Sequence, residues 1–299
     1  MELLIANEKK QNKEEGRVII ANLNDKVEDL KSMVKNSLGL SLSIERIALY
    51  YNNQSSNEKV FLNNNEKKLV DYGVLDKTKI YYKDLGPQIG WRTVYIIEYL
   101  GPLILISYFF LSMGPSKTNT TQKMAFFMST FHYLKRIIES VFVHEFSRST
   151  MPLKNLLTNC FYYWILYGLI CGYTLFNENY VEDSPRSFFR YLMAFLFFSA
   201  EIKNLKCHLI LKKLKENNKG EKGIPHGEGF EYVSCANYFW EFIAWGCFSI
   251  FVNLLSFYVF TWCGFWIMMQ WAKKKHAEYL KTFSDRYPKN RKAFIPFLI

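Results

Sequence analysis

The sequence lacks the short motifs that identify several common enzyme classes. It contains no GxGxxG, GxxxxGK[ST], HExxH or GxSxG pattern. We therefore expect no Rossmann cofactor domain, no P-loop, no zincin site and no nucleophile elbow. The six cysteines include no CxxC pair and lie mostly in apolar surroundings. Such thiols behave as small hydrophobic groups, so we expect a reducing environment, no disulfide framework and no metal site.

A signal peptide is also missing from the start of the sequence. Residues 1–16 have neither a basic start before a long apolar run nor a small-residue cleavage site. We therefore expect internal segments to direct any insertion into a membrane.

The basic excess is confined to one part of the chain. Residues 1–90 hold 14 basic and 13 acidic side chains, whereas residues 91–299 hold 24 and 14 and also carry the long apolar runs. A nucleic-acid-binding protein would carry its excess on a polar domain, so we expect no nucleic acid partner. Basic residues beside apolar segments are typical of cytosolic membrane loops or of a site for phosphorylated ligands.

Residues 1–84 alternate as in a small soluble α/β domain. Strands are predicted over 2–6, 17–21, 46–51 and 79–83, and a helix over 27–38 ends at Gly39. This ββαββ order resembles the ubiquitin-like β-grasp fold. Residues 85–90 form a linker, in which two glycines and a proline interrupt regular structure.

Residues 91–299 have the pattern of a multi-pass helical membrane domain. Apolar segments cover 91–113, 123–144, 155–176, 187–200 and 242–272, and the last is long enough for two helices. We expect six to seven transmembrane helices in total. The basic tail after residue 272 indicates a cytosolic C-terminus, and the soluble N-terminal domain should lie on the same side.

Glu98 is an ionisable residue within the first apolar segment, which makes it a candidate functional group. One interpretation is an interfacial carboxylate paired with Arg92 or another cation. The other is a carboxyl group that desolvation keeps protonated, so that it can donate a hydrogen bond.

The segment 132–144 carries two polar stripes at helical spacing. Tyr133, Arg136 and Ser140 form one, and His132, Arg136 and Glu139 form the other. A helix with this content must face a protein interior or a wet cavity. The stripes could also be a structural ion-pair network between helices.

Further polar pairs occur where apolar segments end. Asn237 and Glu241 lie four residues apart, as do Asn204 and His208, which places each pair on one helix face. The first pair suits a planar amide or a ribose, although Asn237 could equally cap a helix. The second could be part of a solvated basic face. By composition, the run of cations and polar rings that follows residue 272 could be a lipid-headgroup anchor; it contains Lys275, His276 and Tyr279.

In order, these segments resemble the steroid 5α-reductase family. The similarity lies in residues 132–155, in VSCANYFWE (233–241) and in the basic C-terminal block 271–299, which ends in YPKNRKAFIPFLI. Within the family they are most similar to trans-2-enoyl-CoA reductases, which also have a ubiquitin-like N-terminal domain and a GPQxxW junction like residues 86–91. The resemblance spans the chain, and the C-terminal block is its most specific part.

The resemblance implies a seven-helix endoplasmic reticulum fold that binds NADPH and a long-chain trans-2-enoyl-CoA. Glu98 and Tyr133 match the pair that grips the substrate carbonyl, and Tyr238 is an alternative proton donor, so that the choice between the two tyrosines stays open. A larger set matches motifs that line the cofactor: Asn204, His208, Asn237, Tyr238, Glu241, Lys275, His276 and Tyr279. Cations around Arg136 and Arg148 are expected to hold cofactor or CoA phosphates.

The implied function is reduction of the trans-2,3 double bond of long or very-long-chain enoyl-CoA, the last step of fatty acid elongation, which also serves sphingolipid metabolism. Membrane lipids and other elongase enzymes are the expected partners. Ala236 stands where this branch usually has proline, and Trp240 could reshape the pocket, which affects the expected acyl-chain preference. The alternatives are a steroid or polyprenol reductase of the same family and a non-catalytic membrane adaptor.

Overall fold

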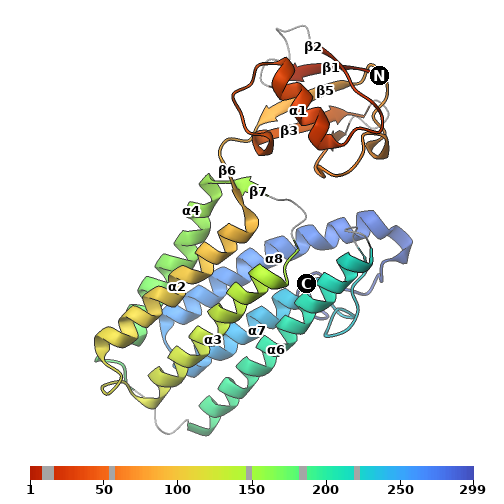
Figure 1. The fold of residues 1–299 in the computed structure, drawn as a ribbon. Helices are drawn as coiled ribbons and strands as arrows, with labels where there is room; N and C mark the ends of the chain where they lie inside the picture. The colour runs from red at the N-terminus through yellow and green to blue at the C-terminus, as the bar shows by residue number, and fades with distance from the viewer. Residues whose placement is uncertain (9–16, 54–57, 146–149, 182–186, 219–222) are drawn as a thin grey trace. The chain divides into compact units, whose positions relative to one another are not determined.

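The computed structural model describes residues 1–8, 17–53, 58–145, 150–181, 187–218 and 223–299. The chain divides into two compact units. One comprises residues 1–91 with the described residues 150–156, and the other comprises residues 92–145 and 157–299. Figure 1 labels most of the helices and strands of both units.

The first unit is built on a mixed five-stranded sheet in the order β2-β1-β5-β3-β4. The central strands β1 (Glu2–Asn7) and β5 (Lys79–Asp84) pair in parallel, and the other neighbours are antiparallel. The remaining strands are β2 (Arg17–Ile20), β3 (Ile47–Asn52) and β4 (Lys59–Phe61). Four of the five strands correspond to predicted ones, whereas β4 is only three residues long and gave no signal in the sequence.

Helix α1 (Val27–Ser37) supplies the other half of this small core. Val27, Leu30 and Val34 follow one another on one helix face and are fully buried. They pack with alternate residues of the strands, among them Leu3 and Ile80. Burying a side chain of this size contributes about 1.5–3 kcal/mol. Gly39 has φ +60°, the left-handed conformation that ends such helices.

Part of the predicted linker is regular. Gln88–Gly90 forms strand β6, which pairs with β7 (Thr150–Pro152) as a two-stranded antiparallel ribbon. Both strands belong to the first unit. The GPQxxW junction (residues 86–91) and the segment TMPLKN (residues 150–155) are therefore neighbours in space.

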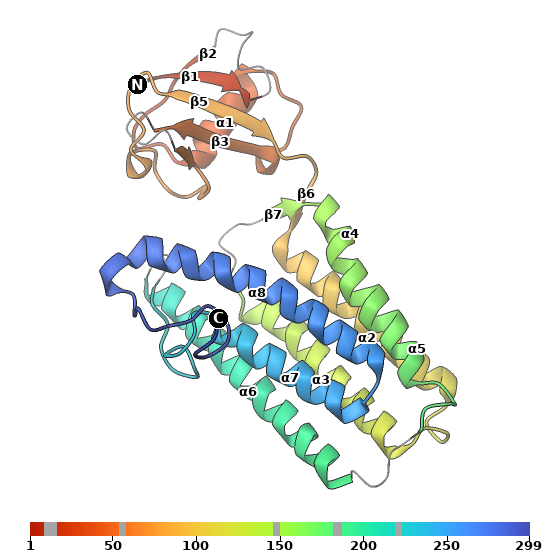
Figure 2. The ribbon, with the colours of Figure 1, turned by 180° about the vertical axis from the view of Figure 1, so that it is seen from behind.

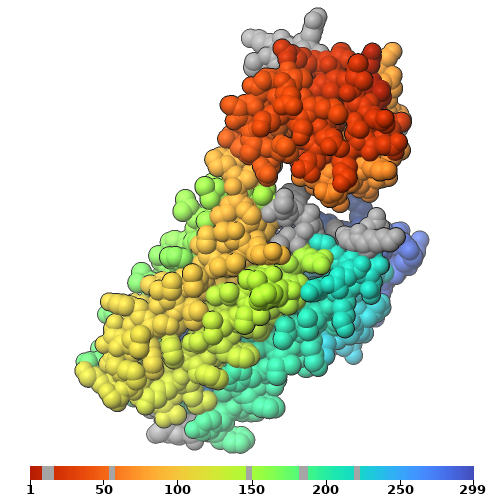
Figure 3. Space-filling view, viewed as in Figure 1, coloured from red at the N-terminus to blue at the C-terminus, as the bar shows by residue number. Residues whose placement is uncertain are grey.

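The second unit is a bundle of long helices (Figures 1 and 2). Its members are α2 (Trp91–Met113), α3 (Thr120–Phe142), α6 (Ser187–Asn217), α7 (Ala236–Val252), α8 (Leu255–Phe283) and the segment formed by α4 (Lys154–Cys160), the π-helix η4 (Phe161–Cys171) and α5 (Gly172–Leu175). The space-filling view shows α3 between α2 and α6 on the near face (Figure 3). Helix α7 packs against both α6 and α8.

The long apolar run of residues 242–272 does contain a helix break. Helix α7 ends at Val252, and Asn253 takes the left-handed conformation with φ 51° before α8 begins at Leu255. Asparagine tolerates this conformation better than most residues. The prediction of two helices in this run is confirmed.

By length and composition, α2 is the one helix among the described residues that qualifies as a membrane span. Six to seven spans were expected. Helices α3 and α6 carry several charged residues, α7 has 17 residues, and α4, η4 and α5 divide one apolar run into shorter elements. Hydropathy alone therefore identifies fewer spans than the sequence pattern predicted.

Candidate functional site

Glu98 lies on α2 at a turn with two unusual neighbours. Pro102 has no amide hydrogen, so the Glu98 carbonyl receives no helical hydrogen bond from it. At Gly101 a Cβ atom would overlap the indole ring of Trp164. That indole donates from Nε1 to the Ile97 carbonyl at 3.0 Å. The π-helix η4 therefore packs closely against the turn that carries Glu98.

The Glu98 side chain is only 2% exposed, and its partner is an amide rather than a cation. Asn159 donates from Nδ2 to Glu98 Oε1 at 2.7 Å. Within the described part of the chain, Glu98 makes no ion pair, so the expected alternative of pairing with Arg92 is not observed. Asn159 was not singled out in the sequence, although it is a polar residue within an uncharged apolar run.

Tyr133 on α3 is fully buried, and its hydroxyl has no hydrogen-bond partner among the residues that the structure describes. The rings of Tyr167, Trp245 and Tyr99 surround it, with centroids 5.0, 5.9 and 6.4 Å away. An unpaired buried hydroxyl costs about 1–3 kcal/mol. Such a group is suited to donate a hydrogen bond to a bound molecule.

Arg136 lies one turn from Tyr133 on α3 and reaches the residue that follows Glu98. Its Nη2 donates to the Tyr99 hydroxyl at 2.8 Å, and Tyr99 is the residue after Glu98. Its Nη1 donates to Glu139 Oε2 at 2.7 Å, and His208 Nδ1 lies 3.1 Å from that same oxygen. Arg136 and His208 therefore belong to a buried ion-pair network, the alternative that the sequence left open.

The same network continues between α3 and α6. Lys135 contacts Glu201 Oε2 at 2.7 Å and donates to Asn204 Oδ1 at 2.6 Å. His132 Nδ1 lies 2.7 Å from Glu201 Oε1. Glu201 was missed in the sequence, although it is an acidic residue within a largely apolar segment.

Asn204 links this network to the start of α7. Its Nδ2 donates to the Asn237 carbonyl at 2.8 Å and to Glu241 Oε2 at 3.2 Å. Asn204, from the predicted pair Asn204 and His208, thus contacts both members of the other predicted pair, Asn237 and Glu241. The side-chain amide of Asn237 makes no hydrogen bond to any described residue and is available to a ligand.

Tyr238 and Lys275 meet at the end of the bundle where α7 begins. Lys275 Nζ lies 4.8 Å from the centre of the Tyr238 ring, a cation–π contact. The next residue, His276, lies with its Nδ1 2.6 Å from Ser234 Oγ, which is also 2.6 Å from the Tyr287 hydroxyl. Tyr279 stacks on Tyr287 with ring centres 5.3 Å apart.

The predicted site residues therefore form three local groups. Glu98, Tyr133 and Arg136 are joined through Tyr99; Asn204, Asn237 and Glu241 are in contact; and Lys275, His276 and Tyr279 lie beside the C-terminal segment. In the described ranges, no hydrogen bond or ion pair joins the third group directly to Glu98 or Tyr133. Arg148, an expected phosphate ligand, lies outside the described residues.

One cluster in this region has metal-binding residue types. Possible ligand atoms of Glu139, His144 and His208 all lie within 4.8 Å of one another. However, Arg136 Nη1 is 2.7 Å from Glu139 Oε2 and 3.3 Å from His208 Nδ1. A guanidinium thus takes the position that a cation would need, which favours an ion-pair network.

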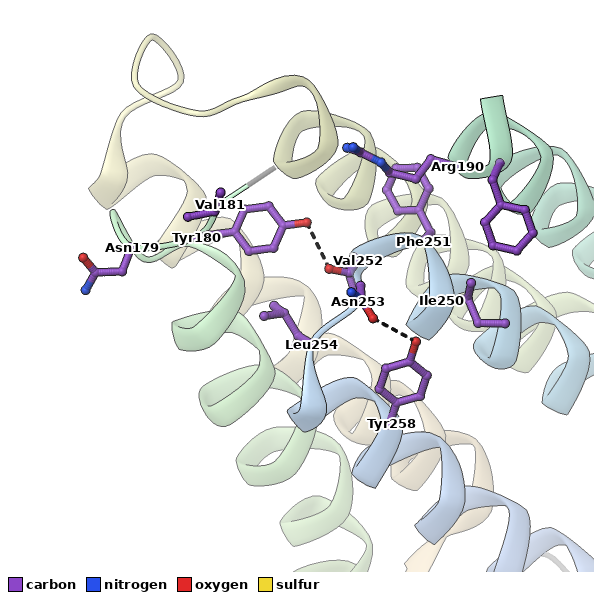
Figure 4. Close-up of a pocket in the computed structure, with 11 residues that line it drawn as sticks. Asn179, Tyr180, Val181, Arg190, Ile250, Phe251, Val252, Asn253, Leu254 and Tyr258 are labelled. Carbon is purple, nitrogen blue, oxygen red and sulfur yellow. Dashed lines mark hydrogen bonds between the residues drawn. The ribbon is translucent and has the colours of Figure 1, made fainter. Parts of the chain in front are cut away.

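A separate pocket of about 200 Å³ lies where α7 ends and α8 begins (Figure 4). Tyr180 donates across it to the Val252 carbonyl at 3.0 Å, and Tyr258 donates to Asn253 Oδ1 at 3.2 Å. None of the predicted site residues lines this pocket.

Comparison with known proteins places the chain in a family. Residues 149–299 match the family model described as 3-oxo-5-alpha-steroid 4-dehydrogenase. A very-long-chain enoyl-CoA reductase of Dictyostelium discoideum is 39% identical over 242 residues, 78% of this chain and 79% of that protein. A protein named "Probable very-long-chain enoyl-CoA reductase" of Caenorhabditis elegans is 40% identical over 255 residues, 78% of this chain and 80% of that protein. A trans-2,3-enoyl-CoA reductase-like protein of Bos taurus is 33% identical over 237 residues, 74% of this chain and 64% of that protein. The chain belongs to the 3-oxo-5-alpha-steroid 4-dehydrogenase family of membrane reductases.

Proposed function

We propose that this protein reduces the trans-2,3 double bond of long or very-long-chain enoyl-CoA with NADPH, the last step of the fatty acid elongation cycle. The names of relatives about 40% identical over most of the chain support the reaction. The observation that carries the proposal is the hydroxyl of buried Tyr133, which has no hydrogen-bond partner among the described residues. The Tyr133 ring centre lies 6.4 Å from that of Tyr99, the residue after Glu98.

Tyr133 and Glu98 act on the thioester oxygen in this proposal. Negative charge develops on that oxygen when the double bond is reduced. The Tyr133 hydroxyl and a protonated Glu98 carboxyl each donate a hydrogen bond to it, while Asn159 holds the carboxyl through Oε1. Each preplaced donor in a water-poor site can contribute about 3–4 kcal/mol to lowering the barrier.

NADPH, when bound, supplies the hydride for Cβ of the enoyl group. The amide of Asn237 and the carboxylate of Glu241 are of the chemical type that binds a carboxamide or a ribose. Lys275, His276 and Tyr279 supply a cation and polar rings for the rest of the dinucleotide, with Asn204, His208 and Arg136 supporting these groups. The unpaired Asn237 amide is the structural observation that fits this assignment.

Either Tyr133 or Tyr238 protonates Cα. The contact of Lys275 with the ring of Tyr238 favours Tyr238, because a nearby ammonium stabilises the phenolate that remains after the proton has left. Tyr133 then keeps its role at the thioester oxygen throughout the reaction.

The proposal includes the organisation of the whole chain. Residues 1–84 form a cytosolic ubiquitin-like β-grasp domain, residues 85–90 the linker, and residues 91–299 a catalytic domain of six to seven transmembrane helices in the endoplasmic reticulum membrane. Both termini lie in the cytosol. The substrate's acyl chain enters from the lipid, and other elongase enzymes deliver it.

The test uses the purified protein in detergent with NADPH and trans-2-hexadecenoyl-CoA, followed by the loss of absorbance at 340 nm and by mass spectrometry of the saturated product. We expect turnover of the enoyl-CoA and none of a 3-oxo-4-ene steroid. Turnover of the steroid alone would assign the protein to the other branch of its family. Binding of neither NADPH nor enoyl-CoA would favour a non-catalytic adaptor.

A further inference from the structure

The π-helix η4 contains three consecutive aromatic residues with polar atoms, residues 162–164, and the two outer ones bond the backbone of neighbouring helices. Tyr162 donates from its hydroxyl to the Phe260 carbonyl of α8 at 3.1 Å. Trp164 donates from its indole to the Ile97 carbonyl of α2 at 3.0 Å. Tyr162 and Trp164 therefore hold η4 against both α8 and α2.

Tyr163, the residue between them, makes no such bond. Its hydroxyl has no hydrogen-bond partner among the described residues, and its contacts are made by the ring. The ring packs edge-on against Tyr99 of α2, with centroids 5.4 Å apart, and against Tyr162 at 4.9 Å. Tyr163 is only partly buried, and its oxygen is not among the fully enclosed polar atoms that lack a partner. A bound molecule can therefore reach this hydroxyl.

Tyr163 lies beside the groups that the proposed function assigns to the thioester. Tyr99, which its ring contacts, follows Glu98 in α2, and the Tyr99 ring centre is 6.4 Å from that of Tyr133. Glu98 and Tyr99 act electrostatically on Tyr163, and Tyr163 in turn acts on Tyr133. Tyr163 and Tyr133 therefore place two hydroxyls without protein partners around one ring, that of Tyr99.

Hydroxyls without partners are unfavourable inside a helix bundle, because the hydration that they lose is not replaced. Phenylalanine would fill nearly the same volume as Tyr133 or Tyr163 without this cost. The presence of both hydroxyls fits a ligand group that accepts more than one hydrogen bond.

We propose that Tyr163 is a further substrate-contacting residue, whose hydroxyl donates a hydrogen bond to the thioester oxygen of the enoyl-CoA. This inference rests on the proposed function. An enolate oxygen has three lone pairs and can accept a third donor beside Tyr133 and Glu98. Hydrogen bonds to a charged acceptor are stronger than those to a neutral one, so the Tyr163 hydroxyl stabilises the enolate more than the bound substrate.

The direct test compares two ligands that cannot be reduced and that differ at the thioester carbonyl. Hexadecanoyl-CoA has this carbonyl, whereas S-hexadecyl-CoA is a thioether of the same chain length and lacks it. Calorimetric titration of the full-length protein in detergent measures both affinities. We expect Tyr163→Phe to weaken binding of hexadecanoyl-CoA about two- to tenfold, the effect of one lost hydrogen bond, and to leave binding of S-hexadecyl-CoA unchanged.

Tyr162→Phe is the matched control, because it removes the same group from the adjacent residue, where the hydroxyl bonds the Phe260 carbonyl. This control should lower thermal stability and leave the ratio of the two affinities as in the wild type. If Tyr163→Phe weakens both ligands equally, Tyr163 serves only to pack η4 against α2. If it changes neither affinity, its hydroxyl does not touch the thioester. Either result overturns the proposal.

Turnover gives a second readout and separates this inference from the proposed function. Tyr163→Phe should lower kcat for trans-2-hexadecenoyl-CoA about 10²-fold and change KM much less, because the charge on the oxygen develops in the transition state. A wild type that reduces enoyl-CoA beside a Tyr163→Phe variant that does so equally fast would contradict the inference alone. Loss of the preference for hexadecanoyl-CoA in Tyr163→Phe, with a wild type that reduces no enoyl-CoA, would contradict the proposed reaction alone.

Discussion

Two buried tyrosines in the bundle differ in the hydrogen bonding of their hydroxyl groups. This difference distinguishes a hydroxyl that stabilises the fold from one that can bind a ligand. Tyr133 and Tyr167 are both fully buried with rings 5.0 Å apart. The Tyr167 hydroxyl lies 2.6 Å from Ser129 Oγ, whereas the Tyr133 hydroxyl has no hydrogen-bond partner in the described part of the chain. Only the second is free to bind a substrate oxygen.

Replacing Tyr133 by phenylalanine should therefore affect turnover and leave stability nearly unchanged. We expect Tyr133→Phe to lower kcat for enoyl-CoA about 10²- to 10³-fold, the effect of losing one preplaced donor. Thermal unfolding should shift little, because no existing hydrogen bond is lost. Tyr167→Phe is the matched control, with an expected loss of about 1 kcal/mol of stability and near-normal turnover. Near-normal turnover together with a clear loss of stability in Tyr133→Phe would show that Tyr133 serves only to pack the core.

Asn159 is expected to act only through Glu98. We predict that Asn159→Ala lowers kcat, since the carboxyl group loses the donor that fixes its Oε1, and that it has little further effect in a Glu98→Ala background, where no acceptor for Asn159 remains. A double-mutant cycle on kcat measures this coupling. Additive losses in the double variant would show that Asn159 acts independently of Glu98.

At this scale the sequence indicated the candidate residues but not their partners. Glu98, Tyr133 and Asn204 stand out because polar groups in apolar helices are costly. Asn159 gave no comparable signal, because an uncharged amide in an apolar run is ordinary. Its proposed role depends on Glu98, a partner that is distant in the sequence.

At the scale of elements, the contact between α2 and the π-helix η4 determines where Glu98 points. Gly101 allows the Trp164 ring to lie against the backbone of α2, and Trp164 bonds the carbonyl of Ile97. The wide turns of a π-helix are rare and are frequently found at functional sites. The sequence predicted a helix over residues 155–176 but not this local widening, because it depends on packing against α2.

Adding one methyl group tests this contact. Gly→Ala within a helix ordinarily stabilises by up to about 1 kcal/mol. At Gly101 we expect the opposite, a loss of about 1–3 kcal/mol from overpacking, with reduced turnover because the turn of Glu98 shifts. Gly246→Ala in α7 is the control, since a Cβ there meets no atom within 4 Å. Thermal unfolding and kcat of both variants are compared, and equal behaviour of the two would contradict the proposed packing role.

For the molecule as a whole, each unit has its own hydrophobic core, and ion pairs of Glu8 make the stability of the first unit depend on pH. In the first unit, Glu8 pairs with Lys83 at 2.9 Å and with Lys59 at 3.3 Å. The hydrogen bond from Lys83 above all, aided by Lys59 and Tyr50, lowers the pKa of Glu8. A lowered pKa means that Glu8 stabilises the fold above its ordinary pKa of about 4.3 and loses this effect as pH falls through the lowered value.

Hydrogen exchange of the first unit within the full-length protein can detect this effect. At pH 7 we expect faster exchange of amides in β3 (Ile47–Asn52) in Glu8→Gln than in the wild type. The difference should disappear as the pH falls through the lowered pKa of Glu8, because the wild-type carboxylate is then protonated as well. A difference that persists unchanged at low pH would exclude the ion pairs as its cause.

The overall architecture could be predicted because the two parts of the chain have different compositions. Balanced charge with alternating strands indicated the first unit, and apolar runs with a basic excess indicated the bundle. The number of membrane spans was harder to predict, since α3 and α6 use charged residues inside the bundle and so resemble polar helices. These charges can lie inside the bundle because they are paired: Lys135 contacts both Glu139 and Glu201.

The measurement closest to the central claim is single-turnover mass spectrometry with NADPH deuterated at the transferable C4 position and trans-2-hexadecenoyl-CoA. The account predicts a saturated acyl-CoA with one deuterium at Cβ, formed by the wild type and nearly absent with the Glu98→Ala/Tyr133→Phe double variant, which lacks both donors. A saturated product without deuterium at Cβ, or a double variant as fast as the wild type, would contradict it.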